Sequence, residues 1–352
     1  MLNIYNDAQA LQWSQIIKSF PDHDINYLPQ YTRAFALHGD GEPQLFYYEG
    51  QGLRAANVVM RRDIAGEPSL AGKIESQRYF DLATPYGYGG WIFDGDLTAA
   101  GLEELDQVYQ DYCQAENIIS EFVRFHPLLG SETACAKMYE IVSHGPLICM
   151  DLSDPDTIWE NIDRKKRNII RKALKENVTV QFGLNAEILE QFKDIYHETM
   201  EHKQAEEYYF FSDIFYHSIL TDLKDNALIF YALQGETVIA ATIVIMAGTK
   251  MNYHLSGSRV AYRSCDPGSL LLYHTALWGC ENGYKTLLLG GGLGSAEDSL
   301  LRFKKGFNKK SDYIFKTGRK IFVPQVYAQL CELRQASGDF EENSSFFPRY
   351  RL

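Results

Sequence analysis

Residues 227–256 decide the fold of this chain, and they read ALIFYALQGETVIAATIVIMAGTKMNYHLS. This stretch holds three apolar runs rich in β-branched residues, at 227–233, 237–247 and 251–256. Short turns around Gly235 and Gly248 separate the runs. Apolar runs of this length that are joined by glycine turns predict three consecutive strands.

The segments on both sides of these strands predict alternating helices and strands. Asp154-Pro155 opens the first helical stretch, because Asp is a preferred cap and Pro suits the first helical position. The expected helices are 158–176, 186–203, 212–223, 267–282 and 298–307, and the further strands are 178–182, 286–289 and 313–316. Helices that lead into an antiparallel run, followed by a helix and another strand, predict an α/β sheet of mixed direction.

The first half of the chain follows a weaker version of the same plan. Its expected elements are helices 8–19 and 97–117 and strands 44–48, 53–61 and 118–125. We therefore expect two similar α/β lobes, each with a sheet of its own, that divide near Gly145-Pro146. The first domain would cover 1–146 and the second 147–320. Residues 321–352, with a helix after Pro324, would pack back on the first.

The composition points to a globular protein and excludes several classes. The 352 residues are 45% hydrophobic and 23% charged, which suits about two domains with real cores. A net charge of −12 argues against a basic nucleic-acid-binding domain, although a local positive groove would still allow such a ligand. The six cysteines lack metal-binding spacing, so we expect reduced thiols, no metal site and a cytoplasmic location. Neither a signal pattern nor an apolar run of roughly 20 residues is present in the sequence.

A glycine-rich segment follows the expected strand 286–289 and reads LLLGGGLG at 287–294. The dinucleotide-binding pattern G-x-G-x-x-G fits no register here, because Ser295 or Glu297 falls at its last position. The Gly-Lys-Ser/Thr of a P-loop is missing as well. The glycines therefore allow the backbone to approach either a ligand or a neighbouring helix closely.

Four segments, in order along the chain, resemble the motifs of one family. They are PYGYGG at 85–90, RKKRNIIRKA at 164–173, YHLSGS at 253–258, and the glycine-rich loop followed by DSLLRFKKGF at 298–307. Over nearly its whole length the chain resembles the Fem-type transferases of the cell wall and their BioF-like acetyltransferase relatives. The resemblance implies an α/β protein of two tandem GNAT-like domains, with mixed sheets and a cleft between them.

The resemblance also implies an enzyme that acylates amines. The expected acceptor is the amine of a cell-wall peptide, or of an amino sugar on a nucleotide or lipid carrier. No cofactor is expected to be tightly bound; the acyl donor would be an aminoacyl-tRNA or an acyl-CoA, which makes charged tRNA an expected partner. The first domain would bind substrate and the second would carry catalysis, without stable insertion into a membrane. A non-catalytic module that binds glycan precursors is a third hypothesis.

Lys304 is the foremost catalytic candidate. Acyl transfer to an amine passes through a tetrahedral oxyanion, which a fixed cation stabilises in a dry site. In the family the lysine of the Phe-Lys segment is placed for this role, and it corresponds to Lys304, while Phe303 would close the site or pack. Tyr253 would position the amine or take its proton. His254 ranks below Tyr253, because a lone histidine on a strand is more often structural.

The remaining candidates would bind substrate. They are Tyr86, Tyr88, Asp81, Arg167, Arg171, His202, Tyr208, Tyr209, His254, Ser256, Gly291 and Gly292. Tyr86 and Tyr88 display hydroxyls on a glycine-rich loop, and Asp81 would orient an ammonium group. Arg167 and Arg171 share one face of a helix, together with the other cations of a basic run that could meet phosphates.

Departures from the family pattern bear on the donor. Acetyl-CoA enzymes of the GNAT class carry Arg/Gln-x-x-Gly-x-Gly/Ala, whose amides hold the pyrophosphate, but residues 263–269 here read RSCDPGS. Asp266 would cap the following helix and repel a pyrophosphate, which argues against acyl-CoA. The coiled-coil arm with which some Fem-type enzymes grip tRNA is missing, which argues against tRNA, though armless relatives exist. His202 stands where an arginine for substrate phosphates is expected.

Overall fold

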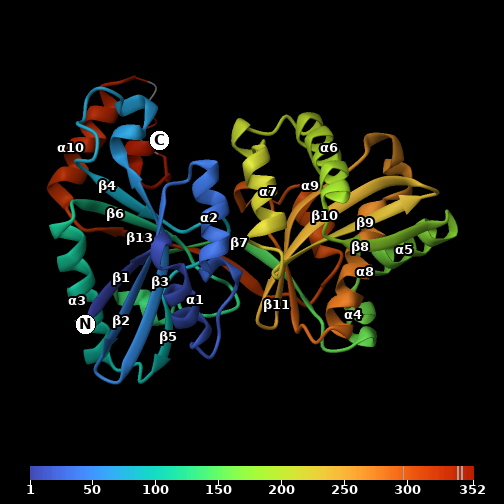
Figure 1. Ribbon diagram of the computed structural model, residues 1–352, viewed down its shortest axis with the longest axis horizontal. Helices are drawn as coiled ribbons and strands as arrows, with labels where there is room; N and C mark the ends of the chain where they lie inside the picture. Colours follow the sequence, from blue (N-terminus) through green and yellow to red (C-terminus); the bar gives the residue numbers. More distant parts are fainter. Residues whose placement is uncertain (296, 339–340, 342–343) are drawn as a thin grey trace. The chain divides into compact units, whose positions relative to one another are not determined.

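The computed structural model describes residues 1–295, 297–338, 341 and 344–352, and the chain divides into two compact units (Figure 1). The first unit comprises Met1–His144 and Lys316–Leu352, and the second comprises Gly145–Phe315. We expected the second domain to run on to residue 320. The chain instead returns to the first unit at Lys316, because a single strand, β13 (Tyr313–Ile321), crosses from one unit to the other.

The first unit contains a mixed sheet with helices on both of its faces. In chain order its elements are β1 (Leu2–Asn6), α1 (Ala10–Lys18), α2 (Pro29–His38), β2 (Glu42–Gly50), β3 (Leu53–Asp63), β4 (Phe80–Ala83), β5 (Ile92–Gly95), α3 (Ala99–Ala115), β6 (Ile118–Arg124), the start of β7 (Glu140–Asp151), the end of β13 and α10 (Pro324–Gln335). Its 3-10 helices are Asp7–Gln9, Ile25–Tyr27, Ile64–Gly66, Pro68–Leu70, Ala134–Lys137 and Arg349–Arg351.

The strands of this unit follow the order β1-β2-β3-β4-β6-β13, and β5 also pairs with β3. Strands β4 and β6 are parallel, whereas the neighbouring pairs with β3 and β13 are antiparallel. Helix α3 covers one face of the sheet and α1 and α2 the other (Figure 1). The core under α3 contains Tyr109 and Trp91, and α10 packs through Leu330 against Ile64 and Ile119 of the same unit.

The second unit repeats this arrangement. In chain order its elements are the end of β7, α4 (Pro155–Asn161), α5 (Arg164–Lys175), β8 (Val178–Gly183), α6 (Ala186–His202), α7 (Asp213–Thr221), β9 (Ala227–Gln234), β10 (Thr237–Ala247), β11 (Lys250–Ser258), α8 (Pro267–Glu281), β12 (Thr286–Gly290), α9 (Ser299–Lys305) and the start of β13. Its 3-10 helices are Glu207–Tyr209, Val260–Cys265 and Leu293–Ser295.

The second sheet follows the order β7-β12-β11-β10-β9-β8, and β11 and β12 are its parallel pair. The three strands expected in 227–256 form β9, β10 and β11 as antiparallel neighbours. Helices α4, α5 and α8 pack on one face around a core that includes Ile170, Leu271 and Met251, whereas α6 packs on β10 and β11 from the other face. The expected mixed α/β fold is therefore confirmed.

Two expectations about the elements are wrong. The single helix expected over 158–176 is two helices, because Asp163 interrupts it and caps α5 through a 2.7 Å bond from the Lys165 amide. The two sheets also share a strand. Strand β7 is 12 residues long, which lets it belong to the first unit up to His144 and pair with β12 from Ile148 to Asp151 in the second.

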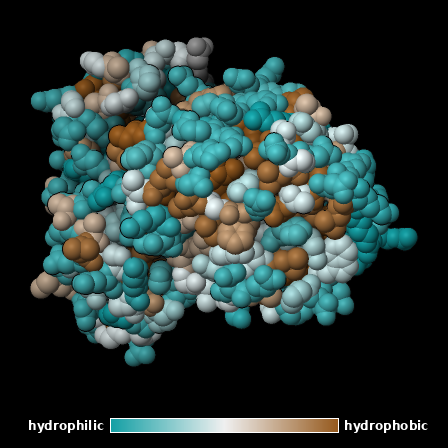
Figure 2. Space-filling view, turned by 45° about the vertical axis from the view of Figure 1, so that its right-hand side comes forward, coloured by the Kyte–Doolittle hydropathy of each residue, from teal (hydrophilic) through white to brown (hydrophobic). Residues whose placement is uncertain are grey.

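The surface shown in Figure 2 is mostly hydrophilic, with apolar side chains gathered in its middle. Among the residues that the structure describes, no helix is long and apolar enough to cross a membrane. The same residues contain no group of His, Cys, Asp or Glu that could hold a metal ion. These observations direct the search for a functional site to the polar side chains around the two sheets.

Candidate functional site

The site begins where the parallel strands β11 and β12 stop pairing. They pair from Lys250 opposite Thr286 to Asn252 opposite Leu288, and beyond these positions the two strands do not pair with each other in the described residues. In an α/β sheet, the ends of parallel strands that separate are the usual place for a ligand. The side chains that follow Asn252 and Leu288 therefore form the candidate site.

A β-bulge in each strand accompanies this separation. Leu255 and Tyr253 face consecutive residues of β10, so His254 is an extra residue in β11. Leu289 is an extra residue of β12 against β7 in the same way. Bulges redirect side chains and end regular pairing, and they are frequent beside active sites. Neither bulge was expected from the sequence, because a run of strand-forming residues gives no signal for an unpaired position.

The bulge brings Tyr253 and Ser256 to the same side of β11. Burial raises the pKa of the Tyr253 phenol to about 12, which a hydrogen bond with Ser256 partly offsets and the charge of Asp266 reinforces. Burial also lowers the pKa of His254 to about 3. Both side chains are therefore uncharged at neutral pH. A phenol with this pKa is protonated at neutral pH and can donate a hydrogen bond, and the expected role of Tyr253 toward the amine stays a prediction.

The loop after β12 requires glycine at two positions. Gly290 has a φ of +78°, a conformation that residues with a side chain rarely adopt. A Cβ atom on Gly291 would lie 3.2 Å from the carbonyl oxygen of Pro146 and 3.3 Å from a methyl group of Leu147. Gly292 follows and is half-buried. The close approach at Gly291 is therefore to strand β7, and not to the neighbouring helix that the sequence offered as an alternative to a ligand.

Lys304 lies buried beside this loop. Its side chain projects from α9, its Nζ donates a 2.7 Å hydrogen bond to the carbonyl oxygen of Gly291, and 8% of the residue is exposed. Burial lowers the pKa of Lys304 to about 8; the charge of Lys203 lowers it further, and Asp298 raises it. Lys304 thus places an ammonium group, removed from bulk water, at the end of β12.

Phe303 packs beside a second buried lysine that sequence reasoning missed. The Lys166 ammonium lies 4.2 Å from the centre of the Phe303 ring and donates a 3.0 Å hydrogen bond to Ser269. Burial lowers the pKa of Lys166, while Asp266 and Asp163 raise it. Helical spacing with Ile170 and Ala173, which are both buried, was the signal that separates Lys166 from the exposed cations around it.

The N-terminus of α8 is already occupied by a carboxylate of this chain. Asp266 caps the helix, with its Oδ1 accepting bonds from the Ser269 amide at 3.3 Å and the Ser269 hydroxyl at 2.8 Å. The Lys166 ammonium lies 3.9 Å from the other oxygen of Asp266. The negative charge that a helix N-terminus attracts is therefore supplied internally, as the sequence suggested.

Arg167 and Arg171 project from α5 over one aromatic ring. The guanidinium carbons of Arg167 and Arg171 lie 5.8 Å and 5.1 Å from the ring centre of Trp159, which belongs to α4. Within the described residues no carboxylate lies in ion-pair distance of the α5 cations Arg164, Lys165, Arg167, Arg171 and Lys175. In a chain with a net charge of −12, α5 thus presents a positive surface, although Lys166 and Lys172 of the same helix lie within ion-pair distance of Asp266 and Glu176.

The residues expected near the end of α6 are exposed or half-buried. His202 accepts a 2.6 Å hydrogen bond at Nε2 from Arg263, so this nitrogen carries no proton in that arrangement. Tyr208 and Tyr209 lie in the following 3-10 helix with their rings in edge contact. Arg263 thus places a guanidinium group beside His202, both residues belong to the second unit, and the expected role of His202, Tyr208 and Tyr209 in substrate binding stays a prediction.

Three expected residues lie in the first unit. The Tyr86 ring stacks on Phe35, and the Tyr86 carbonyl accepts a 2.7 Å bond from Tyr31. The Tyr88 ring contacts His126 edge-on. Both tyrosines are half-buried on the loop after β4. The loop is thus held by aromatic packing and backbone hydrogen bonds, and no contact described here tests its expected role in substrate binding.

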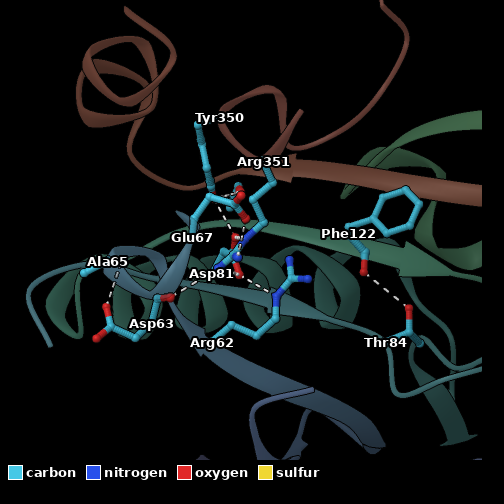
Figure 3. A network of polar contacts seen from close by, with 10 residues as sticks. Arg62, Asp63, Ala65, Glu67, Asp81, Thr84, Phe122, Tyr350 and Arg351 are labelled. Carbon is cyan, nitrogen blue, oxygen red and sulfur yellow. Dashed lines mark hydrogen bonds and ion pairs between the residues drawn. The ribbon is translucent and has the colours of Figure 1, made fainter. Parts of the chain in front are cut away.

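The expectation that Asp81 orients a substrate ammonium is wrong. Asp81 is fully buried, and its carboxylate pairs with Arg62 at 2.8 Å and with Arg351 at 2.6 Å (Figure 3). The Tyr350 hydroxyl donates a further bond of 3.0 Å to it. Although burial alone would raise it, the two arginines hold the pKa of Asp81 below its usual range. All of these partners belong to the first unit, so Asp81 is structural.

The comparisons with known proteins concern the fold and the domain in residues 163–305. Residues 163–305, less than half of the chain, match the family model described as an acetyltransferase (GNAT) domain. No curated protein sequence matches the chain. The solved structure of FemX is similar over 94% of this chain and 99% of its own, with a TM-score of 0.67 and 14% identity.

Two further solved structures share the fold at lower similarity. The C-terminal domain of a putative lysylphosphatidylglycerol synthetase from Agrobacterium fabrum has a TM-score of 0.56 and 12% identity, and covers 89% of this chain and 92% of its own. The L-PGS structure from Bacillus licheniformis has a TM-score of 0.52 and 14% identity, and covers 85% and 91%. At these identities the likeness concerns the fold alone.

Proposed function

We propose that this protein, whose residues 163–305 form a GNAT-type acetyltransferase domain and whose fold is that of FemX, transfers an acyl or aminoacyl group to an amine. The observation that carries the proposal is the buried ammonium group of Lys304 at the end of β12. A lysine that only packed there would leave its charge in a desolvated position at a cost in stability. The attraction between this ammonium group and a developing oxyanion would offset that cost.

The proposed reaction exchanges one bond to the acyl carbon for another. The lone pair of the acceptor amine attacks the carbonyl carbon of the donor, and the carbonyl electrons move to the oxygen. Lys304 donates a hydrogen bond to that oxyanion in the tetrahedral intermediate. When the intermediate collapses, the bond to the leaving oxygen or sulfur breaks and the amide forms. The proton lost by the amine nitrogen ends on the leaving atom.

Tyr253 suits the transfer of that proton better than His254. A phenol with a pKa of about 12 remains protonated at neutral pH and can pass its proton to the leaving atom while it receives one from nitrogen. His254, with a pKa of about 3, binds a proton too weakly to act as a base at neutral pH. We assign Tyr253 to proton relay, and Ser256 to holding the phenol in place.

The acceptor is proposed to be an amine attached to a phosphate-bearing carrier. The name of one similar solved structure, a putative lysylphosphatidylglycerol synthetase, connects this fold with a phosphate-bearing lipid, and the sequence resemblance to Fem-type transferases implies a cell-wall acceptor. The unneutralised cations of α5, with Arg167 and Arg171 ordered over Trp159, favour a partner that presents phosphates. We propose an amine of a cell-wall peptide or of an amino sugar on a nucleotide or lipid carrier, in the cytoplasm.

The donor is proposed to be an aminoacyl ester, as in charged tRNA, in preference to an acyl-CoA. A pyrophosphate would bind most readily at the N-terminus of the helix that follows the separating strand β11. That helix is α8, and Asp266 with its counter-ion Lys166 already occupies its N-terminus. An acyl-CoA-dependent reaction on a small amine or sugar is the second candidate, which the GNAT domain match favours.

The decisive experiment offers both donors to the same protein. Radiolabelled acetyl-CoA and, separately, tRNA charged with labelled amino acids are incubated with the wild type and with Lys304→Met, in the presence of amine acceptors. We expect the wild type to discharge the aminoacyl ester and the variant to lose this activity. If neither donor is discharged, the enzymatic proposal fails, and a module that binds glycan precursors is the hypothesis to test next.

A further inference from the structure

We propose that Asp298 is the positioning residue of the active site: by binding both the glycine-rich loop and α9, it holds Lys304 in place and maintains its charge. The inference rests on the proposed function, because it concerns the residue that we take to stabilise the oxyanion. It goes beyond that function by assigning a role to a carboxylate that the sequence analysis left without one.

The two carboxylate oxygens of Asp298 bind different parts of the chain. Oδ1 accepts a 2.7 Å hydrogen bond from the amide of Leu301, in the first turn of α9. Oδ2 accepts a 3.0 Å bond from the amide of Leu293, five residues earlier in the loop. Lys304 closes the arrangement from the other end of α9 through its 2.7 Å bond to Gly291. Both ends of α9 are thus bonded to the residues that directly follow β12.

An ordinary helix cap does not require this second bond. Asp154 caps α4 through the amide and hydroxyl of Thr157, three residues later, and Asp163 caps α5 through the amide of Lys165. Both carboxylates bind the helix that they begin. Asp154 also accepts a 3.4 Å bond from the hydroxyl of the adjacent Ser153, but Asp298 is the one of these three that binds a backbone amide of the preceding loop. An asparagine or serine would cap α9 about as well, so the cap alone does not explain an aspartate.

Charge explains the choice of aspartate. The charged groups that act on Lys304 are Asp298, which raises its pKa, and Lys203, which lowers it after the larger effect of burial. Burial and the charge of Arg263 lower the pKa of Lys203, and the charge of Asp298 raises it. Asp298 itself remains ionised, because its hydrogen bonds to backbone amides and the charge of Lys304 hold its pKa below its usual range despite burial. It is therefore the carboxylate that offsets two neighbouring lysines.

The test measures the protonation of Lys304 without any substrate. Trace acetic anhydride labels the wild type and variants across pH 6–11, and the labelling of the Lys304 peptide, read by mass spectrometry, gives its titration. We expect Asp298→Asn, which preserves the cap, to move this titration to lower pH. Lys203→Met should move it to higher pH, since it removes a like charge. Asp154→Asn, the matched cap variant on α4, should leave it unchanged.

Turnover then separates this inference from the proposed function. In Asp298→Asn we expect turnover to fall several-fold at pH 8 and to change little at pH 6, since Lys304 remains protonated at the lower pH. A titration of Lys304 that does not move in Asp298→Asn overturns the inference, whatever the activity. A titration that moves while the turnover profile does not supports the inference for Asp298 and removes Lys304 from the catalytic mechanism.

Discussion

Strands β4 and β6 in the first unit and β11 and β12 in the second are parallel pairs, and the two pairs differ in how they end. In the second unit, β11 and β12 pair over three residues each and then separate, and glycines and Lys304 follow. In the first unit, β4 and β6 pair as far as Ala83 opposite Phe122, and the chain then continues the contact. Thr84 binds the Phe122 carbonyl through its amide at 3.1 Å and the Arg124 amide through its hydroxyl at 2.7 Å.

The first pair is closed further by residues from distant parts of its unit. Gly89 exchanges backbone hydrogen bonds with Arg124 and His126, and the Tyr350 hydroxyl bonds to Ser120 of β6 at 2.8 Å. Figure 3 shows Arg351 and Arg62 meeting Asp81 of β4. The same order of elements therefore yields one strand pair that polar side chains close and one that separates beside Lys304. The order of elements sets the fold, and the residues at the strand ends decide whether the pair is closed.

The largest expected effect concerns the parallel pair of the first unit, β4 and β6, which is called the sealed pair. It follows from removing the Asp81 carboxylate that binds Arg62 and Arg351 there. Asp81→Ala leaves two arginines near a buried position without their carboxylate, which typically costs 3–5 kcal/mol. We expect chemical denaturation to show a loss of this size, with the transition of the first unit affected. Asp94→Ala is the matched control, because it removes a half-exposed partner of Arg54 in the same unit and should cost far less. Equal losses in both variants would contradict the assigned importance of the Asp81 network.

The sealed pair also shows what the sequence could and could not reveal. The apolar runs of β9, β10 and β11 predicted the second sheet, since each strand is set by local composition. Asp81 was misinterpreted because its partner Arg351 lies 270 residues away in sequence. The bulge at His254 depends on how β11 meets β10, which no local pattern encodes. Lys304 and the glycines were found through motifs, but the burial that gives Lys304 its pKa comes from packing.

The next effect concerns the parallel pair of the second unit, β11 and β12, which separates beside Lys304 and is called the open pair. Lys304→Met keeps the length of the side chain and removes its charge, so we expect turnover to fall roughly 10²-fold, about the effect of losing one oxyanion donor. KM should change little, because the lost interaction forms only in the transition state. Lys305→Met serves as control, since Lys305 is more exposed and pairs with Glu297. Normal turnover in Lys304→Met would show that Lys304 does not take part in catalysis, and that the two strand pairs differ in structure alone.

A smaller effect is expected on the α5 surface. Replacing Arg167 and Arg171 together by Glu reverses the charge that we assign to substrate phosphates. We expect KM to rise roughly tenfold with kcat nearly unchanged, because phosphate contacts persist from the ground state to the transition state. The effect should weaken at high salt. Lys137→Glu, which changes an exposed cation of the first unit, is the control. An unchanged KM in the double variant would show that α5 is an ordinary solvent-exposed helix that does not bind substrate.

The smallest effect is on stability, and its sign distinguishes a functional lysine from a structural one. The pKa of Lys304 falls from 10.5 in the unfolded chain to about 8 in the folded protein, chiefly through burial. Between these values the unfolded chain binds more protons, so the stability of the wild type rises with pH. Below pH 8 the folded protein bears the full cost of the buried charge. A lysine kept for packing would instead be expected to contribute stability at neutral pH.

Lys304→Met removes this cost together with the hydrogen bond to Gly291, which offsets part of the gain. We therefore expect the variant to be more stable than the wild type by about 1 kcal/mol at pH 7. This advantage should shrink and then reverse as the pH rises from 8 toward 10.5, because the wild type loses the cost of the buried charge over this interval while the variant still lacks the hydrogen bond to Gly291. Urea denaturation at pH 7 and pH 10 measures both points. A variant that is less stable than the wild type at pH 7 would show that Lys304 stabilises the fold. The buried charge would then carry no cost in stability that a catalytic role has to explain.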